Sequence, residues 1–404
     1  MKKGKLKIGI VGSGIRGLKC FAVGIEKRND AEITALCDPN PVRMREGAKR
    51  LNGKLVCYTK IEDMLRRERL DAAVITSPDH CHESNAVVAL EKGVNVLIDK
   101  PLATTVKGCE HIRDAARKAG KIAMVGFNLR HEPTIKRLKR IIDDGVLGKV
   151  FLIENREFYP GGRSYMSRWN RKYALSGGLW VHKGSHDFDV FNWLLGFPKP
   201  RKVSSFAGVS VFSPKNIPFK LDKRKKPGPT CHECPYGDTC PDKFDILKYP
   251  EFSDEARAVD KYAKDLCMYL SDKDVHDNGF AIVEYENGVR ASHTECFATS
   301  LHDRLYTVVG DKGQAEVSLD RRTILVRPRW SAETITYELP AIEGGHGGAD
   351  PGLIDHFIKT ISGEGETNST LDHGLLSTAI GQAAEIARRE ERVVFMEELL
   401  AKSP

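Results

Sequence analysis

The sequence GSGIRG, residues 12–17, follows a short β-type run and precedes an amphipathic stretch with helical period. This order of strand, Gly-x-Gly-x-x-Gly loop and helix is typical of the turn that holds the pyrophosphate of a dinucleotide. Gly12 makes the tight turn, Gly14 lets the backbone approach the phosphates, and Gly17 lets the helix pack on the strand. The free N–H groups at the helix start favour anions. We therefore predict cofactor contacts from Gly12, Gly14, Ile15, Arg16 and Gly17.

Asp38 ends the next β-type run, EITALCD, at about the twenty-residue separation expected for a ribose-binding acid. A carboxylate there accepts hydrogen bonds from the ribose hydroxyls and repels a 2′-phosphate, so the sequence favours NAD over NADP. Arg43 lies close enough in sequence to keep NADP open as a weaker alternative. The other interpretation of Asp38 is an ordinary polar residue at a strand end.

Strand and helix patterns continue to alternate up to about residue 130, which predicts an α/β domain with a parallel sheet covered on both faces. The expected strands are 71–77, 94–99 and 121–127, and the expected helices are 83–91 and 106–118. Ligands of such sheets bind beyond the carboxyl ends of the strands. The further cofactor-binding candidates are therefore Ser77, Pro78, His80, His82, Asp99, Lys100 and Asn128.

Size and composition limit the other possibilities. A chain of 404 residues exceeds one comfortable core, so we expect a Rossmann domain at 1–130 and a second domain at 131–404. The apolar runs are strand-sized and the N-terminus lacks a signal-peptide core, which predicts a cytoplasmic protein without a membrane span. Much of the net charge of +8 lies in the basic run 220–227, which indicates a solvated loop. Because this run contains no aromatic residue, we expect no nucleic-acid partner.

Five further segments resemble one protein family. They are VNVLIDKPLA, SPDHCHE, GFNLRHEP, GGLWVHKGSHDFDVFNWLLG and GGHGGADPGLIDHF. Together they are similar to the Gfo/Idh/MocA oxidoreductases, which include glucose–fructose oxidoreductase and inositol dehydrogenases. The resemblance implies NAD(P)-dependent chemistry at a hydroxyl-bearing carbon of a sugar or cyclitol. It also implies a C-terminal α+β domain whose mostly antiparallel sheet has an open face used for homodimer or homotetramer contacts.

The sequence of the second half agrees with such a sheet. The segments 149–159, 280–297 and 304–310 are strand-like, and Asn287-Gly288 inside the second of them is a strong hairpin signal.

The stretch WVHKGSHDFD, residues 180–189, is the densest group of chemically active side chains. His182 and His186 are four residues apart, the spacing of two zinc ligands on one helical face. Lys183 stands where a zinc protease would place its glutamate, and Gly184 and Ser185 indicate a helix that begins between the histidines, with Ser185 as N-cap. We therefore predict a proton-transfer site here rather than a metal site.

Hydride transfer requires a base for the hydroxyl proton and a group that stabilises developing negative charge. The resemblance assigns these tasks to Lys100 and His186. Our hypothesis is that His186 is the base, that Lys100 orients and polarises the hydroxyl, and that His182 and Lys183 contact substrate. The family often places an acid four residues before the histidine, where this chain has His182, so the identity of the proton acceptor stays open. His182 and Lys183 could instead belong to a polar loop that caps a helix.

Other substrate candidates come from two flanking segments. In RSYMSRWNRKYALSGG, Trp169 and Tyr173 would suit stacking on a sugar and Arg168 or Arg171 would suit an acidic group, although interdomain packing explains them equally well. The late element implied by the resemblance adds His346 and Asp350, and Asp350 could instead cap a helix over 351–360.

An insertion at about 214–276 carries the run CHECPYGDTC. Cys231, Cys234 and Cys240 lie in a stretch with few apolar residues, so a metal clip would help it to fold. Cys267 is the best fourth ligand and His232 a weaker one. Zinc fits four thiolates, an iron–sulfur cluster is the alternative metal centre, and free thiols are the plain interpretation. In each case the role would be local folding.

The sequence therefore favours an NAD-dependent dehydrogenase or reductase that acts on a sugar, glycoside or inositol-like polyol. The alternative is an NAD-dependent glycoside-cleaving enzyme that uses transient oxidation and elimination. A non-enzymatic NAD sensor is a third class, and the presence of Lys100 and His186 argues against it, because a binding module needs neither.

Overall fold

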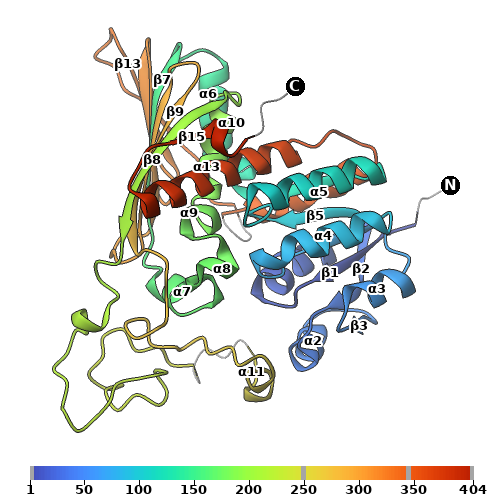
Figure 1. The fold of residues 1–404 in the computed structure, drawn as a ribbon. Helices are drawn as coiled ribbons and strands as arrows, with labels where there is room; N and C mark the ends of the chain where they lie inside the picture. Colours follow the sequence, from blue (N-terminus) through green and yellow to red (C-terminus); the bar gives the residue numbers. More distant parts are fainter. Residues whose placement is uncertain (1–3, 247–251, 343–346, 401–404) are drawn as a thin grey trace.

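The computed structural model describes residues 4–246, 252–342 and 347–400. Within these residues the chain forms two sheets, one of six strands and one of nine, with helices packed between them (Figure 1). None of the helices in this described part is long and apolar enough to cross a membrane.

The first sheet is parallel throughout and has the order β3-β2-β1-β4-β5-β6. Its strands are β1 Leu6–Val11, β2 Ala31–Cys37, β3 Val56–Tyr58, β4 Ala72–Ile75, β5 Asn95–Asp99 and β6 Ala123–Gly126. The connecting helices are α1 Val23–Glu26, α2 Pro41–Ala48, α3 Ile61–Arg67, α4 His82–Glu91 and α5 Val106–Ala119. Every residue of β4 and β6 is buried, as expected for strands covered on both faces. The predicted Rossmann domain is confirmed.

The second sheet has the order β14-β13-β12-β11-β7-β10-β9-β8-β15, and only its β7–β10 pair is parallel within the described residues. Its strands are β7 Val150–Phe158, β8 Pro200–Gly208, β9 Asn278–Tyr285, β10 Arg290–Cys296, β11 Asp303–Gly310, β12 Gly313–Ser318, β13 Thr323–Pro328, β14 Ile335–Glu338 and β15 Val394–Phe395. The hairpin predicted at Asn287-Gly288 joins β9 to β10, and Gly288 has φ +83° there. The mostly antiparallel α+β domain is confirmed.

Helices cover the face of this sheet that is turned toward the first domain (Figure 1). They are α6 Pro133–Asp143, α7 Gly162–Met166, α8 Tyr173–Ser176, α9 Leu179–His182, α10 Ser185–Leu194 and α13 Leu371–Glu390. Helix α12, Ala349–Ile361, returns to the first domain, where Leu353, Ile354 and Phe357 share a core with Ile8 and Phe21. The two halves of the chain are therefore interlocked.

The segment between β8 and β9 runs below both domains in Figure 1 and consists mainly of turns. Its one α-helix in the described residues, α11 Asp254–Asp260, packs on α2 of the first domain. Phe212, Met268 and Tyr269 form a small apolar core with Tyr165 and Phe297 of the second domain. The insertion therefore contacts both domains.

Candidate active site

The glycine loop has the shape that a pyrophosphate cradle requires. Gly12 has φ +101°, and a Cβ there would lie 2.7 Å from the backbone of Thr76 and Ser77. A Cβ on Gly17 would lie 2.1 Å from the carbonyl oxygen of Gly12, whereas one on Gly14 would meet nothing within 4 Å. The loop is thus closely packed on its inner side and open at Gly14, so these residues fit a bound dinucleotide. The following helix is π-helical over Arg16–Ala22 before it continues as α1.

Asp38 lies at the end of β2, next to this loop. Its carboxylate accepts hydrogen bonds from the backbone N–H of Ser13 at 2.7 Å and of Asn40 at 2.9 Å. Burial raises the pKa of Asp38, and the two hydrogen bonds act against that rise. The side chain is therefore fixed in the position from which an acid would accept hydrogen bonds from the ribose hydroxyls.

Arg16 joins three parts of the site. Its guanidinium donates to Asp99 at 2.8 and 3.1 Å and to Asp350 at 2.8 Å. The amide of Asn128 also donates to Asp350, at 2.9 Å. Asp350 lies in the first turn of α12, whose N-cap is Gly348, so the predicted capping role of Asp350 is wrong. His346, the other candidate from this element, lies outside the described residues.

The loop after β4 is attached to the turn after β5 through His82. Nδ1 of His82 lies 2.7 Å from the carbonyl oxygen of Pro101, and Nε2 lies 2.9 Å from that of Ser77. Pro78 immediately precedes the short 3₁₀ turn Asp79–Cys81, and His80 is exposed within that turn. His82 therefore holds together two of the loops predicted to bind cofactor.

Lys100 connects the two domains. Its ammonium donates a hydrogen bond of 2.6 Å to the carbonyl oxygen of His182, at the end of α9. Burial lowers the pKa of Lys100 to about 8, while the negative charges of Asp79 and Asp99 act in the opposite direction. The turn after β5 and the helices that carry the histidines thus meet at one place.

His182 is held by two polar side chains. Its Nδ1 lies 2.6 Å from Oδ2 of Asp79, and the amide nitrogen of Asn170 donates to its Nε2 at 3.0 Å. Because Nε2 accepts this hydrogen bond, the ring proton is on Nδ1, as in a neutral imidazole. Burial lowers the pKa of His182, which also favours the neutral ring. The ring of Trp169 meets it edge-on at 5.3 Å. Sequence reasoning missed Asp79 and Asn170, although Asp79 stands in the loop after β4 that it had singled out.

Lys183 pairs with a different group of charged side chains from the one around His182. Its ammonium lies 2.7 Å from Glu157 on β7 and 5.3 Å from the ring centroid of Tyr159. Arg304 on β11 lies 2.5 Å from the same carboxylate of Glu157 and 3.0 Å from Asp187. Although burial opposes it, the charge of Glu157 raises the pKa of Lys183, so the ammonium stays protonated. Glu157 and Arg304 were not foreseen from the sequence.

His186 lies in the first turn of α10 and is only 9% exposed. The helix begins at Ser185, between the two histidines as predicted. The N-cap is Gly184, however, and the proposed capping by Ser185 is wrong. Lys183 and Gly184 both have helical dihedral angles, so α9 runs into α10 almost without a break.

The other substrate candidates divide into two groups. Trp169, in the 3₁₀ turn that follows Arg168, lies against His182. Tyr173 instead packs under the guanidinium of Arg389, 3.6 Å from the ring centroid, and its backbone N–H donates to Asp274 at 2.6 Å. One face of the Tyr173 ring is thus covered by Arg389.

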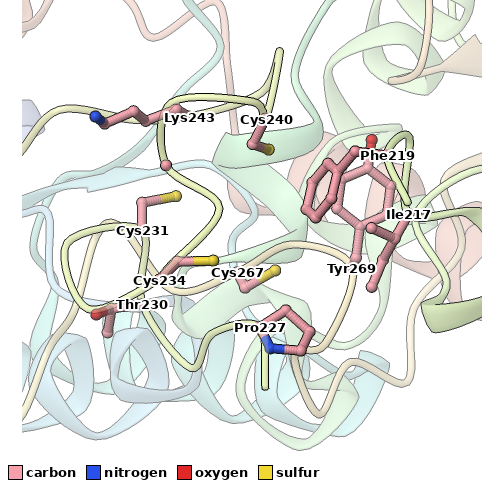
Figure 2. A pocket seen from close by; sticks show the side chains of 11 residues that line it. Ile217, Phe219, Pro227, Thr230, Cys231, Cys234, Cys240, Lys243, Cys267 and Tyr269 are labelled. Atoms are coloured by element: carbon pink, nitrogen blue, oxygen red, sulfur yellow. The ribbon is translucent and has the colours of Figure 1, made fainter. Parts of the chain in front are cut away.

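The four cysteines of the insertion do line one pocket, as Figure 2 shows for Cys231, Cys234, Cys240 and Cys267. Among the described residues, however, no group of three or more His, Cys, Asp or Glu side chains is placed to hold a metal ion. The zinc prediction is therefore not supported, and none of the ten cysteines, all of which lie in the described part, forms a disulfide. The segment is held instead by hydrogen bonds and aromatic packing: Cys231 N–H donates to Asp265 O at 2.7 Å, and Phe219 stacks on Tyr236 at 5.0 Å.

Curated relatives resemble the chain over part or most of its length. YteT of Bacillus subtilis (strain 168) is 26% identical over 91% of this chain and 92% of its own. D-Glucoside 3-dehydrogenase of Escherichia coli (strain K12) is 27% identical over 54% of this chain and 61% of that enzyme. Inositol 2-dehydrogenase/D-chiro-inositol 3-dehydrogenase of Lactiplantibacillus plantarum is 27% identical over 52% of this chain and 56% of its own. The chain thus matches little more than half of these two dehydrogenases.

Solved structures share the fold over almost the whole chain. Levoglucosan dehydrogenase in complex with NADH and levoglucosan has a TM-score of 0.74 at 17% identity, and the match covers 97% of this chain and 99% of that one. The WlbA dehydrogenase from Bordetella pertussis, in complex with NADH and UDP-GlcNAcA, has a TM-score of 0.71 at 20% identity, with 97% and 98% covered.

Two family models assign the two domains. Residues 6–127 match the oxidoreductase family model for the NAD-binding Rossmann fold, and residues 139–396 match the model for the C-terminal alpha/beta domain of the same family. The chain therefore belongs to the Gfo/Idh/MocA family of oxidoreductases.

Proposed function

We propose that this oxidoreductase transfers a hydride between NAD and a hydroxyl-bearing carbon of a sugar, glycoside or inositol-like polyol. The observation that carries the proposal is the 2.6 Å hydrogen bond from Lys100 to His182, because it joins the cofactor domain to the helices that bear both histidines. The names of the relatives, a glucoside dehydrogenase and inositol dehydrogenases, support this substrate class.

The bound nicotinamide supplies the hydride acceptor or donor. The open backbone at Gly14 admits the pyrophosphate, and Asp38 receives the ribose hydroxyls, which favours NAD over NADP. Asp99 and Asn128 support the cofactor site indirectly. The side chain of Asp99 binds Arg16, and that of Asn128 binds Asp350.

The protein's own residues handle the proton. We assign His186 as the base for the hydroxyl proton, and Lys100 as the ammonium that orients the hydroxyl and stabilises the negative charge that develops on its oxygen. His182 and Trp169 contact the substrate beside Lys100. The ion pair of Lys183 with Glu157 sets the charge next to them. This assignment extends the sequence hypothesis by one group, Asp79, which fixes the ring of His182.

The test is an absorbance screen at the nicotinamide band with sugars, cyclitols and their keto forms, together with separate NADH binding measurements by fluorescence. We expect net NADH formation with at least one polyol or sugar, and strongly reduced turnover in Lys100→Ala and His186→Ala with NADH binding retained. A near-normal rate in either variant removes that residue from the mechanism. Release of an aglycone without net NADH would replace the proposal with glycoside cleavage.

A further inference from the structure

We infer that the insertion between β8 and β9 takes part in cofactor selection, because Asp260 on α11 binds Arg43 and so withholds it from the 2′-phosphate of NADP. This inference rests on the proposed NAD-dependent function and adds a specificity residue to it. It assigns to the insertion a role in nucleotide recognition, where sequence reasoning had given it only a role in its own folding.

Arg43 is the cation best placed to accept NADP. It lies in the first turn of α2, five residues after Asp38, and an arginine near the ribose-binding acid is the usual partner of a 2′-phosphate. The charges of Arg43 and Asp260 both act on the pKa of Asp38, in opposite directions, although burial acts on it most strongly. Both groups therefore lie near the carboxylate that would receive the ribose.

The insertion surrounds this arginine. The guanidinium of Arg43 donates to Oδ2 of Asp260, and it stacks over the rings of Phe252 at 4.7 Å and Tyr262 at 5.7 Å. Its side chain is only 14% exposed. A charge that is paired and covered in this way must break its contacts before it can bind a phosphate.

Asp260 is itself anchored to the first domain. Asn40, the N-cap of α2, donates from its amide to Asp260 at 2.8 Å and to the carbonyl oxygen of Ala256 at 2.7 Å. Ala256 and Phe252 are buried in the same apolar core as Val42 and Met44 of α2. The position of Asp260 is thus set by these contacts, and its negative charge lies near Asp38, the carboxylate proposed to bind the ribose.

The test compares NADH and NADPH binding in the full-length protein by nicotinamide fluorescence, which needs no substrate. In Asp260→Asn the shape is kept and the charge is lost, so we expect NADPH affinity to rise about tenfold relative to NADH. Adding Arg43→Met should remove that gain. The matched control is Glu255→Gln on the same helix, whose partner Arg45 is exposed, and it should change the ratio by less than about twofold.

Several outcomes would overturn the inference. One is an NADH-to-NADPH ratio in Asp260→Asn that equals the wild-type ratio while thermal unfolding is unchanged. If Asp260→Asn loosens the insertion, Arg43→Met alone decides: it should leave wild-type NADPH affinity unaltered, and a clear loss would show that Arg43 already contacts the phosphate. A wild-type protein that binds neither nucleotide would refute the proposed function, whereas NADH binding without the Asp260 effect refutes only this inference.

Discussion

Nδ1 of His182 lies 2.6 Å from Oδ2 of Asp79, so the loop after β4 of the cofactor domain supplies a carboxylate to a histidine of the second domain. The resembled family often places an acid at the position where this chain has His182. In this chain the acid stands instead one contact away, on the other domain. Lys100 is close to both residues: it donates to the backbone carbonyl oxygen of His182, and the charge of Asp79 raises its pKa.

The pH dependence of the reaction should reveal the state of Lys100. Burial lowers its pKa to about 8, and our assignment uses the protonated form. The ammonium is present below this pKa and is lost above it, so kcat/KM for oxidation should fall as the pH rises through about 8. Lys100→Arg keeps its charge at every accessible pH and should lack this fall, at a lower absolute rate. A kcat/KM that rises through pH 8 would make Lys100 the base and contradict our assignment.

The substitution Asp79→Asn should shift the pH at which kcat/KM falls. The charge of Asp79 raises the pKa of Lys100, so its removal should let the pKa fall further below 8 and shift the decline in kcat/KM to lower pH. We also expect a loss of about tenfold to a hundredfold in kcat/KM, because His182 loses a charged partner. Asp63→Asn, in an exposed pair on α3, serves as the control and should change neither quantity. If kcat/KM of Asp79→Asn falls at the same pH as in the wild type, Asp79 has only a packing role.

Local sequence signals were enough to predict the first domain and part of the second sheet. The glycine loop, the strand that ends at Asp38 and the Asn287-Gly288 hairpin each depend on neighbours in the chain, and the structure shows all three. The Asp79–His182 contact joins residues 103 positions apart, and the packing of α12 under β1 spans most of the chain. Such contacts follow from how the domains dock, which periodicity and spacing do not encode.

One local prediction, the capping of α10 by Ser185, was wrong, and another, the metal clip, is not supported by the structure. Ser185 was expected to cap α10, yet helical dihedral angles at Lys183 and Gly184 carry the chain from α9 directly into α10. The cysteine spacing suggested zinc, yet among the described residues no group of side chains is placed to hold a metal ion, and the backbone N–H of Cys231 donates instead to Asp265, thirty-four residues later in the sequence. The start of α10 thus depends on the backbone of the two residues before it, whereas in the insertion a contact that is distant in sequence holds the segment.

The glycine loop allows cofactor binding to be separated from stability. Gly14→Ala adds a methyl group where nothing lies within 4 Å, so the fold should be kept while NADH affinity falls by about tenfold or more, because that space is needed by the pyrophosphate. Gly12→Ala forces φ +101° on a residue with a Cβ and brings it against the backbone of Thr76. It should cost about 1–3 kcal/mol and lower Tm by several degrees. Thermal unfolding and NADH titration of both variants check this, and equal Tm losses would contradict it.

The uncovered face of the second sheet should bind a second copy of the chain. Phe206 on β8 and Phe280 on β9 are register neighbours, and they are 74% and 57% exposed, with Ile282 beside them at 51%. None of the helices in the described residues covers this face (Figure 1). Contiguous apolar surface of this kind usually marks an interface.

We therefore expect sedimentation velocity to show a dimer or tetramer for the wild-type protein. Phe280→Asp should dissociate it, because the substitution would bury an unpaired charge in the apolar contact. Trp330→Asp is the control: Trp330 is 78% exposed but lies in the turn between β13 and β14, near the opposite edge of the sheet, so the assembly should persist. A Phe280→Asp variant that sediments like the wild type would place the contact elsewhere. Because α9 and α10 pack on the other face of the same sheet, NADH binding by the dissociated variant would also show whether the site needs the second copy.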